Sequence, residues 1–173
     1  EQVRYYEDFN EIEKKLWSLL IRAVNDRNSE FRTPVFICGD KDNLDGRVVV
    51  LRKVDDKNNF IQFHSDIRST KINIIKKNPH CSLLFYGKKE KIQIRMKVIS
   101  ELHYENEVTK ESWDKTGHIS RKCYLVTKGP GSKSEIPTSG LDSKFDNFDF
   151  SKEESEKGYK NFCVIKCKIK SIE

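Results

Sequence analysis

The segment Ser65–Lys71 gathers basic and hydroxyl side chains in the order Ser-Asp-Ile-Arg-Ser-Thr-Lys. An arginine can bind two phosphate oxygens with its planar guanidinium, a lysine adds a compact positive charge, and hydroxyls add hydrogen-bond donors. The segment follows a strand-like run and enters a helix-like one, where the first amides lack intrahelical acceptors. The pattern therefore predicts a phosphate-binding site at a helix start. A plain helix cap with solvated cations uses the same residue types, so the segment alone leaves that alternative open.

Arginines also stand at both ends of the apolar run Arg47–Arg52, which reads Arg-Val-Val-Val-Leu-Arg. A run this apolar predicts a buried strand, and a buried arginine needs an anionic partner. Side chains alternate along a strand, so Arg47 and Arg52 face opposite sides unless a bulge redirects one of them. We therefore expect Arg47 near the phosphate and Arg52 toward another part of the same site.

A third candidate lies in the run Ile92-Gln93-Ile94-Arg95-Met96, where Gln93 and Arg95 share one face of a predicted strand. The amide of Gln93 can both donate and accept a hydrogen bond, as the edge of a heterocyclic ring requires. A polar outer face of a barrel gives the same alternation, and that interpretation stays equally open here.

The elements that must position these residues are mostly short strands. After an amphipathic helix at residues 8–25, β-rich runs alternate with turn residues, which predicts a mainly β fold: an antiparallel barrel with peripheral helices. The six expected strands are Thr33–Cys38, Arg47–Val54, Phe60–Ser65, Cys81–Tyr86, Ile92–Leu102 and Phe162–Ile172.

One connection inside this barrel has helical spacing, from about Arg68 to Lys77, and it ends at Asn78-Pro79. We expect a single domain over residues 1–173, because this length suits one core. The barrel covers about 31–102 plus the final strand at 162–172, and a helical and loop insertion covers about 104–160.

The chain carries a net charge of +6 and a pI near 9.0, which favours an anionic partner without separating nucleic acid from a phosphorylated small molecule. No apolar run has the length of a membrane span, so we expect a cytoplasmic protein without a membrane segment. The five cysteines are odd in number and lie mostly in apolar runs. They predict neither a disulfide framework nor a metal site.

Taken together, the motifs Arg47–Arg52, Phe63–Lys71 with Asn78-Pro79, and Gln93–Arg95 resemble the pyridoxamine 5′-phosphate oxidase-like family. Members of this family are FMN-binding split β-barrels, and the Asp-x-Arg-Ser-x-Lys pattern is similar to the variant known as the Alr4036-type FMN-binding domain. The resemblance implies FMN as cofactor and a homodimer with FMN at the interface.

The resemblance also implies which residues contact FMN. The phosphate is expected at Arg68, Ser69 and Lys71, and the ring edge at Gln93. Arg52 is expected on the ring or substrate side. From charge placement we hypothesise that Arg52 or Arg95 stabilises the anionic reduced flavin. The full expected set is Arg47, Val48, Val49, Leu51, Arg52, His64, Ser65, Arg68, Ser69, Lys71, Gln93 and Arg95. Arg121 or Gly131 is expected to complete the site of the partner subunit.

The function predicted from this set is that of a flavoprotein oxidoreductase acting on an unknown small molecule, with the flavin as the reaction centre and no catalytic side chain identified. Oxidases of the family hold their substrate phosphate with a Tyr…Ser-Arg-Pro…Ser stretch, which the corresponding residues Ser112–His118 lack. Two alternatives stay open: a flavin-binding module without efficient turnover, and a basic nucleic-acid-binding barrel. No strand interleaves aromatic and basic residues in the ordered way that single-strand binding favours, so nucleic acid is the less expected partner.

Overall fold

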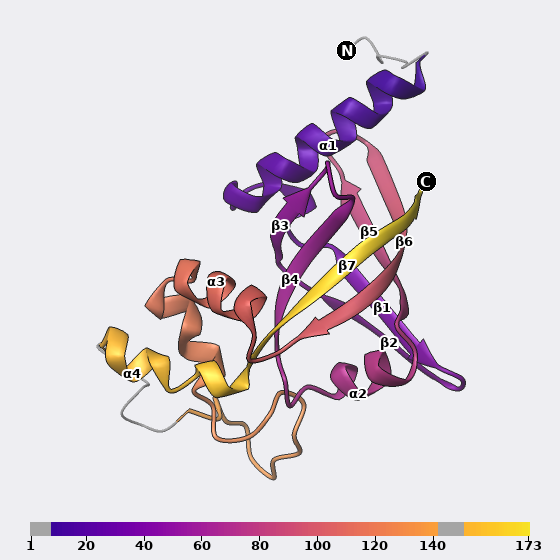
Figure 1. Cartoon of the computed structure of the whole chain (residues 1–173). Coiled ribbons are helices and arrows are strands. Elements are labelled where there is room, and N and C mark those ends of the chain that lie inside the picture. The colour runs from indigo at the N-terminus through magenta and orange to yellow at the C-terminus, as the bar shows by residue number, and fades with distance from the viewer. Residues whose placement is uncertain (1–7, 142–150) are drawn as a thin grey trace.

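The computed structural model describes residues 8–141 and 151–173, in which one antiparallel sheet has the strand order β2-β1-β5-β6-β7-β4-β3. Figure 1 shows this sheet curving into a barrel, with α1 (Phe9–Asn25) across one end and α2 (Thr70–Lys77) at the other. The strands are β1 (Val35–Asp40), β2 (Asn43–Val48), β3 (Leu51–Asp55), β4 (Phe60–Asp66), β5 (His80–Gly87), β6 (Ile92–His103) and β7 (Phe162–Ile172). The predicted mainly β split barrel with peripheral helices is confirmed.

The described residues contain seven strands where the sequence predicted six, because the run Arg47–Val54 forms two. β2 ends at Val48 and pairs with β1, whereas β3 begins at Leu51 and pairs with β4. The chain therefore changes partner within a continuous apolar run. Val49 and Leu51 are buried in the core, whereas β2 has no buried residue, and apolar periodicity alone does not reveal such a change. As a result Arg47 and Arg52 lie on the two opposite edge strands of the sheet.

The core lies inside the curved sheet. Phe36 on β1 and Phe63 on β4 are separated by three strands in the sheet order, yet their ring centroids are 4.8 Å apart. That contact is possible only because the sheet closes on itself. From α1, Leu20 and Ala23 are fully buried beneath the helix, and Asp8 caps its N-terminus through a 2.8 Å bond from the Asn10 amide. Truncating a residue as buried as Leu20 to alanine costs about 2–5 kcal/mol.

A second, smaller cluster lies on the outside of the sheet where β4 and β7 meet. Trp113 and Tyr124 pack there against Phe162 and Val164, with the Trp113 and Phe162 ring centroids 5.0 Å apart. The elements that carry it are α3 (Glu107–Lys115), the 3-10 helices η2 (His118–Tyr124) and η4 (Tyr159–Asn161), and α4 (Lys152–Glu156). In Figure 1 these elements lie to one side of the barrel.

Across residues 8–141 and 151–173, no helix is long and apolar enough to cross a membrane.

Candidate functional site

The edge strand β2 meets the start of α2 through Arg47. One guanidinium nitrogen of Arg47 donates to Ser69 Oγ at 3.0 Å, and the other donates to Thr70 Oγ1 at 3.3 Å and pairs with Asp45. Lys71 follows directly in the first turn of α2. We call the group Arg47, Ser69, Thr70 and Lys71 the α2 site. It gathers two cations and two hydroxyls at one helix end.

Lys71 is buried, with 7% of its surface exposed. No hydrogen bond or ion pair to its ammonium is found within the described parts of the chain. Burial, and after it the nearby charge of Arg47, lowers the pKa of Lys71 below its usual value. The nearby carboxylate of Asp45 acts in the opposite sense, but it is paired with Arg47. A buried lysine side chain without an ion pair of its own is costly, so this position favours an anion.

The helix start itself offers free donors. Ser69 is the N-cap of α2, but its side chain makes no capping hydrogen bond and instead accepts from Arg47. The first amides of α2 therefore receive no side-chain cap, and they carry the positive end of the helix dipole. A phosphate group matches this set of an arginine, a lysine, hydroxyls and open amides.

Arg68 is engaged elsewhere, although it lies between Asp66 and Ser69 in sequence. Its Nε and Nη2 donate to the two carboxylate oxygens of Asp66 at 2.9 and 2.7 Å, and its Nη1 donates to the Val126 carbonyl at 3.1 Å. The hydrogen bonds that Arg68 donates to Asp66 raise the pKa of Arg68. The protein thus supplies this cation with its own anion.

Arg52 lies in a separate cavity of about 400 Å³ between the end of α1, strands β3 and β4, and α3. It occupies an irregularity in the pairing of β3 with β4, and its Nε is buried without a hydrogen-bond partner among the described residues. Gln62 and His64 line the same cavity from β4. Burial, together with the charge of Arg52, lowers the pKa of His64 to about 3, so its imidazole is neutral near pH 7. We call this space the Arg52 cavity.

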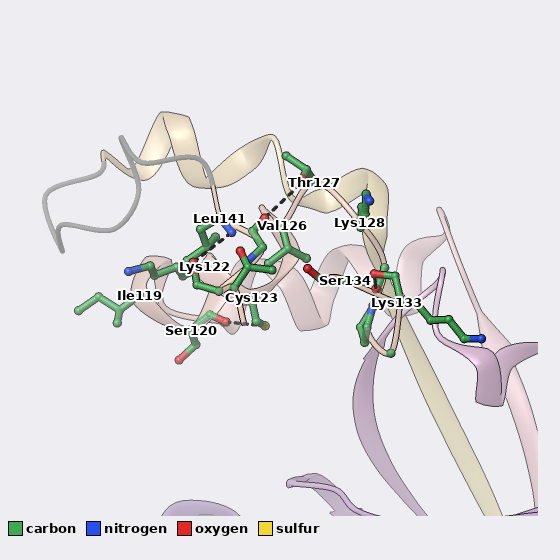
Figure 2. A pocket seen from close by; sticks show the side chains of 17 residues that line it. Ile119, Ser120, Lys122, Cys123, Val126, Thr127, Lys128, Lys133, Ser134 and Leu141 are labelled. Carbon is green, nitrogen blue, oxygen red and sulfur yellow. Dashed lines mark hydrogen bonds between the residues drawn. The ribbon is translucent and has the colours of Figure 1, made fainter. Parts of the chain in front are cut away.

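A wider cavity of about 790 Å³ lies between η2 and the following loop. Figure 2 shows Cys123, Val126 and Ser134 among the side chains that surround it. Gly129 also lines it and at the same time packs against Arg68. This cavity is therefore next to the turn that leads into α2.

The remaining candidates divide between the two faces of the sheet. His64 packs edge-on against Phe162 on the outside of β4, with ring centroids 4.8 Å apart, while Ser65 is buried on the opposite side. Val48 is exposed, whereas Val49 and Leu51 are buried. The last two candidates, Gln93 and Arg95, are exposed on β6, which is separated from β2 by β1 and β5. Arg95 pairs with Glu173.

The structure therefore brings Arg47, Ser69 and Lys71 together and places Arg52 with His64 in another cavity. Thr70 was missing from the predicted contacts, although its hydroxyl stands in the same segment. Arg121 was expected in the site of a partner subunit, but it is 2% exposed and bonded within its own chain to Trp113, Ser155 and Glu156. These contacts hold Arg121 inside its own chain and do not fit that role, while the alternative, Gly131, stays a prediction.

Comparison with known proteins agrees with this fold. Residues 16–102 match the sequence profile of the family described as pyridoxamine 5′-phosphate oxidase, FMN-binding domain. The chain belongs to this family, and its cofactor is FMN. A search of curated protein sequences gives no match.

Solved structures show the same fold at low sequence identity. A pyridoxamine 5′-phosphate oxidase-related, FMN-binding protein from Nostoc punctiforme is 18% identical, with a TM-score of 0.69 over 98% of this chain and 84% of that one. PhzG from Burkholderia lata, solved with tetrahydrophenazine-1-carboxylic acid, is 13% identical with a TM-score of 0.65, covering 95% and 78%. General Stress Protein 26 from Bacillus anthracis is 13% identical with a TM-score of 0.54, covering 91% of each chain.

Proposed function

We propose that this protein is an FMN-dependent oxidoreductase whose α2 site holds the phosphate of the cofactor. The observation that carries the assignment is the buried side chain of Lys71, whose ammonium has no hydrogen bond or ion pair among the described residues and which lies beside Arg47 at an uncapped helix start. A phosphate there would neutralise Lys71 and accept hydrogen bonds from the first amides of α2. The residues present therefore fit the cofactor that the family implies.

Each residue of the α2 site has a distinct role in this proposal. Arg47 would donate from its guanidinium to phosphate oxygens, Ser69 and Thr70 would donate from their hydroxyls, and Lys71 would supply the compensating charge. Bound FMN supplies the electron-transfer chemistry, while the chain binds and orients it. Gln93 on β6 is proposed for the ring edge, since its amide can both donate and accept.

The Arg52 cavity is the proposed substrate side. Arg52 presents a buried Nε without a partner among the described residues, and the neutral imidazole of His64 can donate or accept a hydrogen bond. Gln62 is 4% exposed in the same wall. Such a cavity suits a small polar molecule that satisfies these groups.

We also propose that the protein acts as a homodimer. The outer face of β2 and β5 exposes Leu44 at 80%, Val48 at 64% and Tyr86 at 56%, and Gln93 is paired with Tyr86 across β5 and β6. Exposed apolar side chains grouped on one sheet face favour burial against a second copy. Light scattering of the native protein should give twice the chain mass, and Val48→Asp should shift it toward the monomer. A wild-type monomer at micromolar concentration would contradict this assembly.

The test of the cofactor site is titration of the purified protein with FMN, followed by flavin fluorescence. Lys71→Met is expected to weaken FMN binding about 30-fold or more, because a charge-assisted contact to phosphate is lost. Lys76→Met removes an exposed lysine from the same helix and serves as the matched control. If wild-type protein takes up no FMN, the function fails. If Lys71→Met binds as tightly as wild type, the assignment of the phosphate fails.

Turnover needs a second measurement, because a flavin-binding module without turnover would pass the first. The FMN-loaded protein is mixed anaerobically with NADH or NADPH, and the loss of flavin absorbance is followed. Reduction within seconds, and reoxidation by an added acceptor, are expected for an oxidoreductase. If no nicotinamide reduces the flavin and only a chemical reductant such as dithionite does, the result would favour the module without turnover.

A further inference from the structure

Resting on the proposed function of the α2 site, we infer that Arg68 is a positioning residue, which holds the turn before α2 and joins it to the loop at residues 126–134. The resemblance to the family placed Arg68 among the phosphate ligands. The contacts of Arg68 favour the different role.

Asp66 fixes both the backbone and the side chain of Arg68. The carboxylate of Asp66 accepts hydrogen bonds from the Arg68 amide, at 2.8 Å, and from the Nε and Nη2 of the Arg68 side chain. The Asp66 carbonyl accepts a hydrogen bond from the Ser69 amide at 3.0 Å. Asp66 is 5% exposed, so water competes little for these bonds. One aspartate therefore sets the conformation of residues 66–69, and this turn places Ser69 opposite Arg47.

The guanidinium of Arg68 has few donors left for a ligand. Nε and Nη2 are used by Asp66, and Nη1 donates to the carbonyls of Val126 at 3.1 Å and Thr127 at 3.4 Å. A guanidinium has five N–H donors, and these contacts use four of them. The charge of Arg68 is also neutralised by Asp66, in contrast to Lys71.

Gly129 shows how closely the loop at residues 126–134 lies against this turn. A Cβ atom at Gly129 would lie 2.7 Å from the Cβ of Arg68 and 3.2 Å from its carbonyl oxygen. Only glycine permits this approach without a shift of backbone. The same loop lines the 790 Å³ cavity shown in Figure 2. Arg68 therefore links that cavity wall to the helix that holds the phosphate.

The experiment compares Arg68→Gln, Arg68→Lys, Asp66→Asn and the double variant Asp66→Asn/Arg68→Gln by FMN titration. A positioning role predicts that Arg68→Gln and Asp66→Asn weaken FMN binding to a similar extent, about tenfold. The double variant should bind FMN with about the same affinity as the single variants, because both changes break the same contact. Arg68→Lys should not restore binding, because lysine keeps the charge and loses the bidentate geometry.

A direct phosphate contact predicts the opposite pattern. Asp66→Asn would then free a positive charge beside the phosphate and leave FMN binding unchanged or tighter, while Arg68→Lys would retain most of the affinity. Either result would overturn the inference.

Hydrogen exchange of the FMN-free protein gives a readout that needs no cofactor. Amides at residues 126–134 should exchange faster in Arg68→Gln and Asp66→Asn than in wild type, and Lys71→Met should leave them unchanged. Unchanged exchange in the first two variants would contradict the link. If wild-type protein binds no FMN, the proposed function fails, while this exchange arm still tests the contact.

Discussion

Two regions of the molecule bury a cationic side chain, and they differ in whether the protein supplies an ion pair for it. In the outer cluster, the guanidinium of Arg121 is 2% exposed, lies 4.4 Å from the Trp113 ring centroid, donates to the Trp113 carbonyl at 2.6 Å and pairs with Glu156. In the α2 site, Lys71 is 7% exposed and forms no ion pair among the described residues. The protein itself compensates the charge of the first cation through Glu156, although the Nε of Arg121 has no hydrogen-bond partner among the described residues. The second lies at an open helix start where a ligand can reach it.

This difference separates a structural cation from the one that we propose to bind the phosphate. Arg121 ties α3, η2 and α4 together, because its acceptors come from Trp113, Ser155 and Glu156. Removing it leaves packing and hydrogen bonds unmade inside the chain. Removing Lys71 takes away a charge that the folded protein alone has not compensated. Arg68, paired with Asp66, belongs with Arg121 in this comparison.

The largest effect is expected for Arg121→Met. This change should lower the free energy of unfolding by about 3 kcal/mol, because it removes a buried cation together with its hydrogen bonds to Trp113, Ser155 and Glu156. Urea denaturation of the FMN-free protein measures it. The FMN affinity of the folded variant should stay within twofold of wild type, since Arg121 is outside the α2 site. A large loss of FMN affinity with unchanged stability would reverse the roles assigned to the two regions.

Alkaline pH should weaken FMN binding through Lys71. Its pKa is lowered in the FMN-free protein, chiefly by burial, and a bound phosphate favours the charged form. The affinity for FMN is therefore highest below the lowered pKa of Lys71 and falls as pH rises through it. This decline begins below the usual lysine pKa of about 10.4. We expect about a tenfold loss per pH unit in that range. In Lys71→Met the decline should be absent, and a persistent decline would assign it to another group.

Lys71→Met should also stabilise the FMN-free protein by about 1 kcal/mol, since a buried uncompensated ammonium is replaced by an apolar side chain. Denaturation with and without saturating FMN separates the two effects: the variant is more stable without FMN and gains less from added FMN. Lys76→Met, on the exposed side of α2, should change neither value. A destabilised FMN-free Lys71→Met would show that Lys71 is structural.

The sequence predicted the parts of this comparison that depend on local pattern. Helix α1, the start of α2 and the cluster of Arg47, Ser69 and Lys71 followed from periodicity, charge and helix-end chemistry, with the family resemblance joining them. The break between β2 and β3 did not, because an apolar run looks the same whether or not it changes partner.

Charge partners were the other limit of the sequence. Arg68 and Lys71 look alike as cations near a helix start, and only the folded chain shows that Asp66 neutralises one of them. Likewise the acceptors of Arg121 include Glu156, far along the chain, which no local spacing joins to it. The Arg52 cavity depends in the same way on α3 meeting β4. Such pairings are set by tertiary contacts, so local motifs do not contain them.

The smallest effect is expected for acid destabilisation through Glu156. A hydrogen bond from Trp113, then the contact with Arg121, lowers the pKa of Glu156 in the folded protein. A depressed carboxylate pKa stabilises the fold above the usual glutamate value of about 4.3, and this contribution is lost as pH falls through the folded pKa. The side chain is 50% exposed, so screening keeps the contribution below about 1 kcal/mol. Glu156→Gln should therefore flatten the fall in stability between about pH 5 and 3. An unchanged slope would mean that Arg121 is held by Trp113 and Ser155 without help from the Glu156 charge, which would narrow the contrast with Lys71 to hydrogen bonding alone.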